Sequence, residues 1–64
     1  MVDSREVRLA RAATLEAEAG VNDCYRQKFE ETGEKNGYPN FSQISAHRLA
    51  AARKRESAAR LRAE

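Results

Sequence analysis

Small and apolar residues recur every three or four positions through the first half of the chain. This spacing is that of one face of an α-helix, and it predicts a helix over residues 4–33. Asp3 and Glu6 fit a capping box at its start, and Gly33 or Gly37 suits a left-handed cap at its end. Gly20 leaves a choice open between a continuous or bent helix and a split into two helices. The residues of this face that we expect to pack are Val7, Ala10, Ala17 and Val21.

Turn-forming residues are concentrated in residues 34–41, which we interpret as a helix-to-helix connection. Asn36-Gly37 favours a turn, and Pro39 holds the preceding residue in an extended conformation. Tyr38 and Phe41 are expected to cover the end of a small core. The alternative is that these two aromatic residues bind a partner.

A second helix is predicted over residues 42–63, and it carries apolar seams on two opposite sides. A helix that packs on one neighbour needs a single seam, so the second seam calls for a second surface. The pattern therefore predicts an all-α fold, an antiparallel helical hairpin that forms one domain over residues 1–64 and completes a bundle by self-association. The residues of the first seam that we expect to pack are Ile44, Ala51, Ala58 and Leu61.

Arginines form a row between the two seams of the second helix, at every seventh residue. Such a row fits the salt-bridged flank of a coiled-coil-like helix. It also fits a helix that contacts phosphates, which arginine recognises through two parallel hydrogen bonds. The surface expected to bind a partner consists of Leu49, Ala52 and Ala59, flanked by Arg48, Arg55 and Arg62.

Composition makes a second chain the expected source of stability. Of the 26 hydrophobic residues among 64, 12 are alanine, and a helical core of this size rarely supplies more than about 3–5 kcal/mol. Pairing the helices around residue 39 places Glu64 opposite Thr14, so the first ten or so residues extend past the second helix and leave Val2, Val7 and Leu9 uncovered. An antiparallel second copy would cover them, and the alternative is that a different protein docks there.

Charge is divided unevenly along the chain. Residues 1–40 carry six Lys or Arg against eight Asp or Glu, whereas residues 41–64 carry six against two. Antiparallel packing sets the two segments side by side, so part of this asymmetry is expected to be complementary pairing. The net charge of +2 is too small to require an anionic partner.

Cys24 and His47 are the only residues that could serve as a catalytic nucleophile and its base. Pairing around residue 39 separates them by about 10 Å of helix rise, so we expect no enzyme activity, with Cys24 buried near Lys54 and His47 paired with Glu31. One cysteine and one histidine cannot form a structural zinc site, and no glycine spacing fits nucleotide binding. We therefore expect no metal, no cofactor and no small-molecule substrate.

No stretch approaches the roughly 20 apolar residues that span a bilayer, and the N-terminus lacks the apolar core of a secretory signal. A single cysteine suits a reducing compartment, so we expect a protein of the cytoplasm or of a virion interior, neither secreted nor in a membrane. The leading interpretation is a small non-enzymatic helical protein-interaction module, an adaptor, inhibitor or regulatory subunit, that self-associates as a homodimer or larger homo-oligomer. The alternative is a nucleic-acid-binding regulator that uses the basic second helix.

Overall fold

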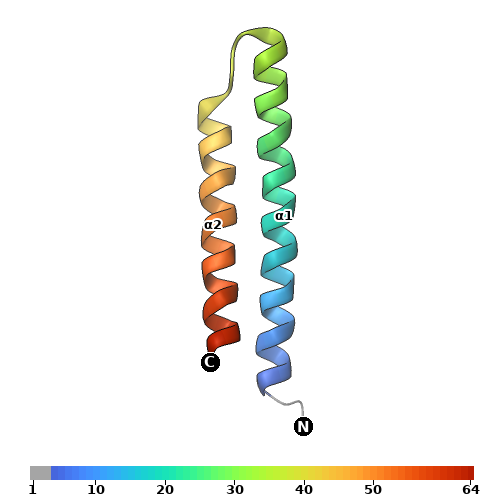
Figure 1. Cartoon of the computed structure of the whole chain (residues 1–64), viewed down its shortest axis with the longest axis vertical. Helices are drawn as coiled ribbons and strands as arrows, with labels where there is room; N and C mark the ends of the chain where they lie inside the picture. Colours follow the sequence, from blue (N-terminus) through green and yellow to red (C-terminus); the bar gives the residue numbers. More distant parts are fainter. Residues whose placement is uncertain (1–3) are drawn as a thin grey trace.

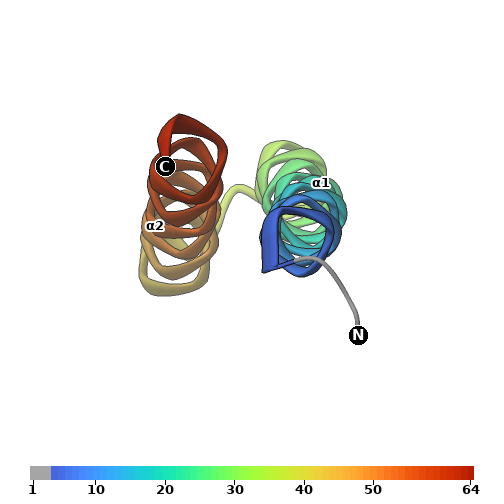
Figure 2. The ribbon, with the colours of Figure 1, turned by 90° about the horizontal axis from the view of Figure 1, so that it is seen from below.

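The computed structural model describes residues 4–64 as two antiparallel α-helices lying side by side (Figure 1). Helix α1 covers Ser4–Asn36 and helix α2 covers Phe41–Ala63. Seen along its length, the hairpin is a single layer of two helices (Figure 2). Its extents are 54 × 14 × 12 Å, so each helix has one helical neighbour within the described chain. The predicted all-α helical hairpin is confirmed.

Both helices lie close to their predicted bounds. Helix α1 runs through Gly20 without a break and ends three residues later than expected, so the alternative of a split at Gly20 is wrong. Asp3, the predicted N-cap residue, lies outside the described residues. Helix α2 begins one residue earlier than predicted because Asn40 caps it, with Asn40 Oδ1 accepting a hydrogen bond from the Gln43 N–H at 3.2 Å.

Two glycines allow the short connection between the helices. Gly37 follows α1 with a φ of 73°, a conformation open to glycine at no steric cost, and its N–H donates to the Gly33 carbonyl at 2.8 Å. Gly33 itself lies inside α1 and is buried. A Cβ added at Gly33 would lie 2.6 Å from Pro39 Cα, so the loop packs against α1 only because this side chain is absent.

Small residues build the interface between the helices. Ala12 and Ala19 of α1 and Ala51 and Ala58 of α2 are at most 2% exposed, and Ile44 is the single larger side chain in the hydrophobic core of the described chain. Alanine at a contact lets two helices approach closely. Along each helix, the residues that face the other helix recur at alternating steps of three and four, as in a coiled coil. Of the four α2 residues expected to pack, the structure buries Ile44, Ala51 and Ala58 and half-buries Leu61.

The face of α1 that meets α2 is not the predicted one. Val7 and Val21 are 43% and 54% exposed, and Ala10 and Ala17 are exposed as well, so the prediction that these four residues pack in the hairpin is wrong. Of the other residues expected to be uncovered, Leu9 is half-buried, and Val2 lies outside the described residues. Two faces of α1 share the same three-and-four spacing, and the other one turns toward α2. Its buried or half-buried members are Ala12, Leu15, Ala19, Asn22, Arg26, Phe29 and Gly33.

Candidate interaction surfaces

One long edge of the hairpin is a row of ion pairs between the helices. At the loop end, Arg48 Nη2 lies 3.7 Å from Glu30 Oε1. At the other end, Arg62 donates from Nη2 to Glu16 Oε1. It donates as well from Nε to Glu16 Oε2 at 3.3 Å, so that pair is bidentate. The acidic and basic rows both step by seven residues and run in opposite directions, as antiparallel helices require. The pairs are Glu16–Arg62, Asp23–Arg55 and Glu30–Arg48.

These ion pairs shift the ionisation of both partners. The hydrogen bond from Arg55 lowers the pKa of Asp23, and the partial desolvation that opposes this shift is the weaker effect. The hydrogen bond from Arg62 lowers the pKa of Glu16 in the same way. In return, the carboxylates raise the pKa of both arginines. The positive charge of the arginine row is therefore compensated by α1, in the manner of a coiled-coil flank.

The opposite edge carries a cluster centred on His47. The His47 ring stacks on Tyr25 and Phe29, with ring centroids 5.3 and 5.9 Å apart and interplanar angles of 20° and 19°. Asn22 Nδ2 donates to His47 Nδ1 at 2.9 Å, and Asn22 Oδ1 accepts from Lys54 Nζ at 2.6 Å. One asparagine amide therefore joins two α2 side chains, and we call these five residues the histidine cluster.

The histidine cluster replaces the contacts expected from the sequence. The sequence predicts His47 beside Glu31, but His47 accepts from Asn22 and Glu31 accepts from Gln27 on its own helix at 3.3 Å, so that prediction is wrong. Lys54 contacts Asn22, and also lies 3.8 Å from Glu18, rather than packing on Cys24. Pairing the helices around residue 39 predicts only which residues lie at the same height along the hairpin. It does not predict the direction in which each side chain points.

Cys24 is exposed on α1, so the prediction that it is buried is wrong. The Nδ1 of His47 is engaged by Asn22. The described hydrogen bonds therefore place no base beside the Cys24 thiol. Within residues 4–64, no group of three or more His, Cys, Asp or Glu side chains is placed to hold a metal ion.

The outer face of α2 is a separate, uncovered surface. Leu49 is 51% exposed, and Ala52 and Ala59 are exposed beside it. Phe41, at the start of the helix, is 71% exposed, and Tyr38 in the loop is 87% exposed. The expectation that these two aromatic residues cover the core is therefore wrong, because Gly33 and Pro39 close that end of the hairpin instead. Both aromatic side chains therefore remain exposed in the hairpin.

A shallow hollow lies beside Phe41 and joins the loop to the outer face of α2. Both helices and the loop contribute to it, and its floor is formed by the buried residues Gly33 and Ile44. The remaining lining residues are Glu30, Glu34, Pro39, Phe41, Ser45 and Arg48. An apolar floor with charged residues at the rim is the usual anatomy of a protein-binding patch.

The fold and its edges define a two-stranded antiparallel helical hairpin of the coiled-coil type with two unlike edges. No model of a known protein family matches the chain, and comparisons with curated proteins and with solved structures give no match either. Neither described helix is long and apolar enough to cross a membrane.

Proposed function

We propose that this chain is a non-enzymatic protein-interaction module that binds a different protein through the outer face of α2 and the aromatic residues of the loop end. The observation that carries the proposal is that small hydrophobic residues fill the interior while larger ones lie on the surface. The hydrophobic core of the described chain holds four alanines and one isoleucine, whereas Tyr38, Phe41 and Leu49, in the loop and on α2, are 87%, 71% and 51% exposed. Aromatic side chains and arginines are the residues that most often dominate binding energy in protein interfaces.

The docking surface follows one side of α2. Phe41, Ser45, Leu49 and Ala52 are spaced by four, four and three residues, so they lie on one face of the helix. Such a face fits an apolar groove or a flat helical surface on the partner. Ala59 extends it toward the C-terminal end of α2. Arg48, Arg55 and Arg62 border it and keep side-chain exposures of 45–70% despite their ion pairs.

A module of this kind acts as an adaptor, an inhibitor or a regulatory subunit. The exposed Cys24 thiol suits the reducing conditions of the cytoplasm or of a virion formed there.

The nucleic-acid alternative relies on the same helix. It would require Arg48, Arg55 and Arg62 to exchange the carboxylates of α1 for phosphates. Their existing pairs therefore favour a protein partner.

The test compares two carboxylates introduced on opposite sides of α2. Ala52→Glu places a charge at the centre of the proposed surface, and Ser57→Glu places the same charge at an exposed position on the other side. Tagged variants are used for affinity capture from the cells that carry the gene, and a captured protein is then purified and titrated against each variant. We expect Ala52→Glu to weaken binding at least about 30-fold, as for a central interface residue, and Ser57→Glu to leave it unchanged.

Equal binding by the two variants would contradict the proposed surface. A parallel titration with a generic DNA duplex at about 50 and 200 mM salt addresses the alternative. A protein that binds through arginine–phosphate contacts loses orders of magnitude in affinity over this range. A tight, salt-sensitive DNA complex would replace the protein-binding proposal with the nucleic-acid one.

A further inference from the structure

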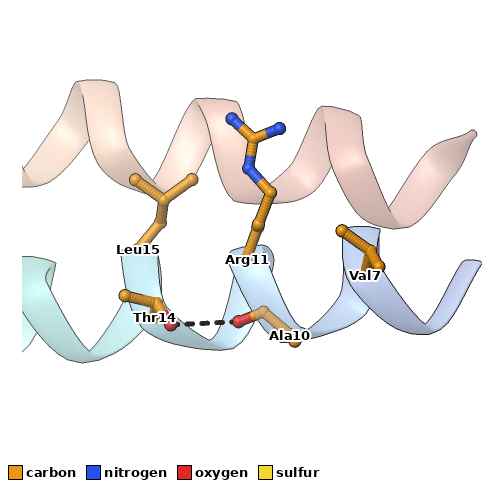
Figure 3. Close-up of a pocket in the computed structure, with 5 residues that line it drawn as sticks. All are labelled: Val7, Ala10, Arg11, Thr14 and Leu15. Carbon is orange, nitrogen blue, oxygen red and sulfur yellow. Dashed lines mark hydrogen bonds between the residues drawn. The ribbon is translucent and has the colours of Figure 1, made fainter. Parts of the chain in front are cut away.

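Helix α1 carries an exposed stripe on the side turned away from α2. Its residues alternate by three and four, in the same way as the face buried against α2, and all of them are exposed. A hollow lies at one end of the stripe (Figure 3). It is lined by Val7, Ala10 and Thr14 and, beside them, by Arg11 and Leu15. We define the α1 stripe as Val7, Ala10, Thr14, Ala17, Val21 and Cys24.

The surface area of the chain indicates how much cover it lacks. The accessible surface is 5015 Å² for a 7.2 kDa chain. A compact folded monomer of that mass exposes about 4,100 Å², so the hairpin exposes about 900 Å² more. A stable interface of standard size removes about 800 Å² from each partner. An interface of standard size along one helix would therefore cover about as much surface as this excess.

We propose that the α1 stripe binds the same stripe of a second copy, with the two α1 helices antiparallel and their twofold axis between residues 15 and 16. A twofold interface must be complementary to itself, and this alignment sets a larger residue against a smaller one. Val7 faces Cys24 of the second copy, Ala10 faces Val21, and Thr14 faces Ala17. The dimer uses a different helix from the proposed partner surface, so the two can be occupied together.

The flanks of the stripe agree with this alignment. On one side, Gly20 would lie within two residues of the height of Ala13 of the second copy, and the small residues at these positions would let the two helices approach closely. On the other side, Arg11 would lie within two residues of the height of Glu18 of the second copy, so that their opposite charges attract. Glu18 of each copy comes near the axis, where Lys54 of its own hairpin lies 3.8 Å from the carboxylate and compensates its charge.

Sedimentation equilibrium tests the face. We expect the wild-type chain to be a dimer and Ala17→Glu, which puts two buried carboxylates near the axis, to dissociate at least about 100-fold more readily. Glutamate is a good helix former, so far-UV circular dichroism should show the helix retained. Ala52→Glu is the matched control, because it carries the same change on α2 and should leave the dimer intact.

The two proposals fail separately in this design. Loss of partner binding with Ala52→Glu concerns only the outer face of α2, whereas loss of the dimer with Ala17→Glu concerns only the α1 stripe. A monomeric wild type, or a dimer that tolerates Ala17→Glu, would overturn the homodimer proposal and leave the proposed function standing.

Disulfide trapping tests the antiparallel alignment. Val7→Cys should place a thiol beside Cys24 of the second copy, so mild oxidation is expected to give a covalent dimer with two interchain disulfides. Oxidation would remove two electrons for each disulfide, with molecular oxygen or oxidised glutathione as the acceptor. The control Val7→Cys with Cys24→Ser should not cross-link efficiently. Efficient cross-linking of the wild type through Cys24 alone would indicate parallel helices and overturn the alignment.

Discussion

The two long edges of the hairpin join the same helices by different means. One edge uses three exposed ion pairs repeated every seven residues. The other uses one half-buried histidine that stacks on two aromatic rings and accepts a hydrogen bond from an asparagine amide. Exposed ion pairs contribute little to stability because water and salt screen them. Stacked rings and a satisfied polar network contribute more for each residue involved.

The difference shows how a chain with an alanine core divides two tasks between its edges. All three ion pairs form together only when α2 runs antiparallel to α1 in this axial alignment, because a shift by seven residues would leave one residue of each row unpaired. Charged edge positions commonly set orientation in coiled coils in this way. The histidine cluster lies near the middle of the hairpin and supplies contacts that alanines cannot. Orientation and cohesion are thus encoded by different residues.

The largest effect is expected from His47→Ala. This change removes two ring contacts and leaves the Asn22 amide without its acceptor, so we expect unfolding to become easier by about 2 kcal/mol. Urea denaturation followed by circular dichroism at fixed protein concentration measures the loss. Arg48→Ala, one residue along α2, is the control on the charged edge and should cost about 0.3 kcal/mol. A larger loss for Arg48→Ala would reverse the comparison.

A smaller effect is expected from removing the whole arginine row at once. The triple variant Arg48→Gln, Arg55→Gln and Arg62→Gln loses every ion pair of the charged edge but keeps polar, uncharged side chains at these positions. Because these pairs are exposed, its melting temperature should fall by less than that of His47→Ala alone. High salt should lower the melting temperature of the wild type toward that of the triple variant. If the triple variant failed to fold, the charged edge would be the main source of cohesion.

The contrast between edges also explains what the sequence could and could not predict. The two helices and the α2 residues that meet α1 follow from spacing and turn residues, which are local signals. The sequence does not single out the α1 face that meets α2, because two faces of that helix have the same spacing and similar small residues. Glu16, Asp23 and Glu30 repeat at the seven-residue step of the arginines, and matching the two rows would have placed the correct face beside them.

Other features of the surfaces depend on tertiary contacts and had no local signal. Tyr38 and Phe41 are exposed because Pro39 takes the space above Gly33. The histidine cluster depends on the direction in which Asn22 and Tyr25 turn, which helical spacing alone leaves open. Both features depend on how closely the alanine-rich faces of the two helices approach each other.

The smallest expected effect is a pH dependence of stability that comes from the charged edge alone. Arg55 and Arg62 lower the pKa of Asp23 and Glu16 below the ordinary values of 3.8 and 4.5. A carboxyl whose pKa is lowered by folding stabilises the fold at any pH above its unfolded value, and this contribution is lost as the pH falls through the folded value. The charged edge should therefore keep its full effect from pH 7 down to about pH 5 and lose it at more acidic pH. Melting curves of the wild type should show a decline below pH 4.5 that is weaker in a Glu16→Gln, Asp23→Asn variant. Equal declines in the two proteins would mean that these carboxylates gain nothing from their arginines, and the charged edge would then set orientation through shape alone.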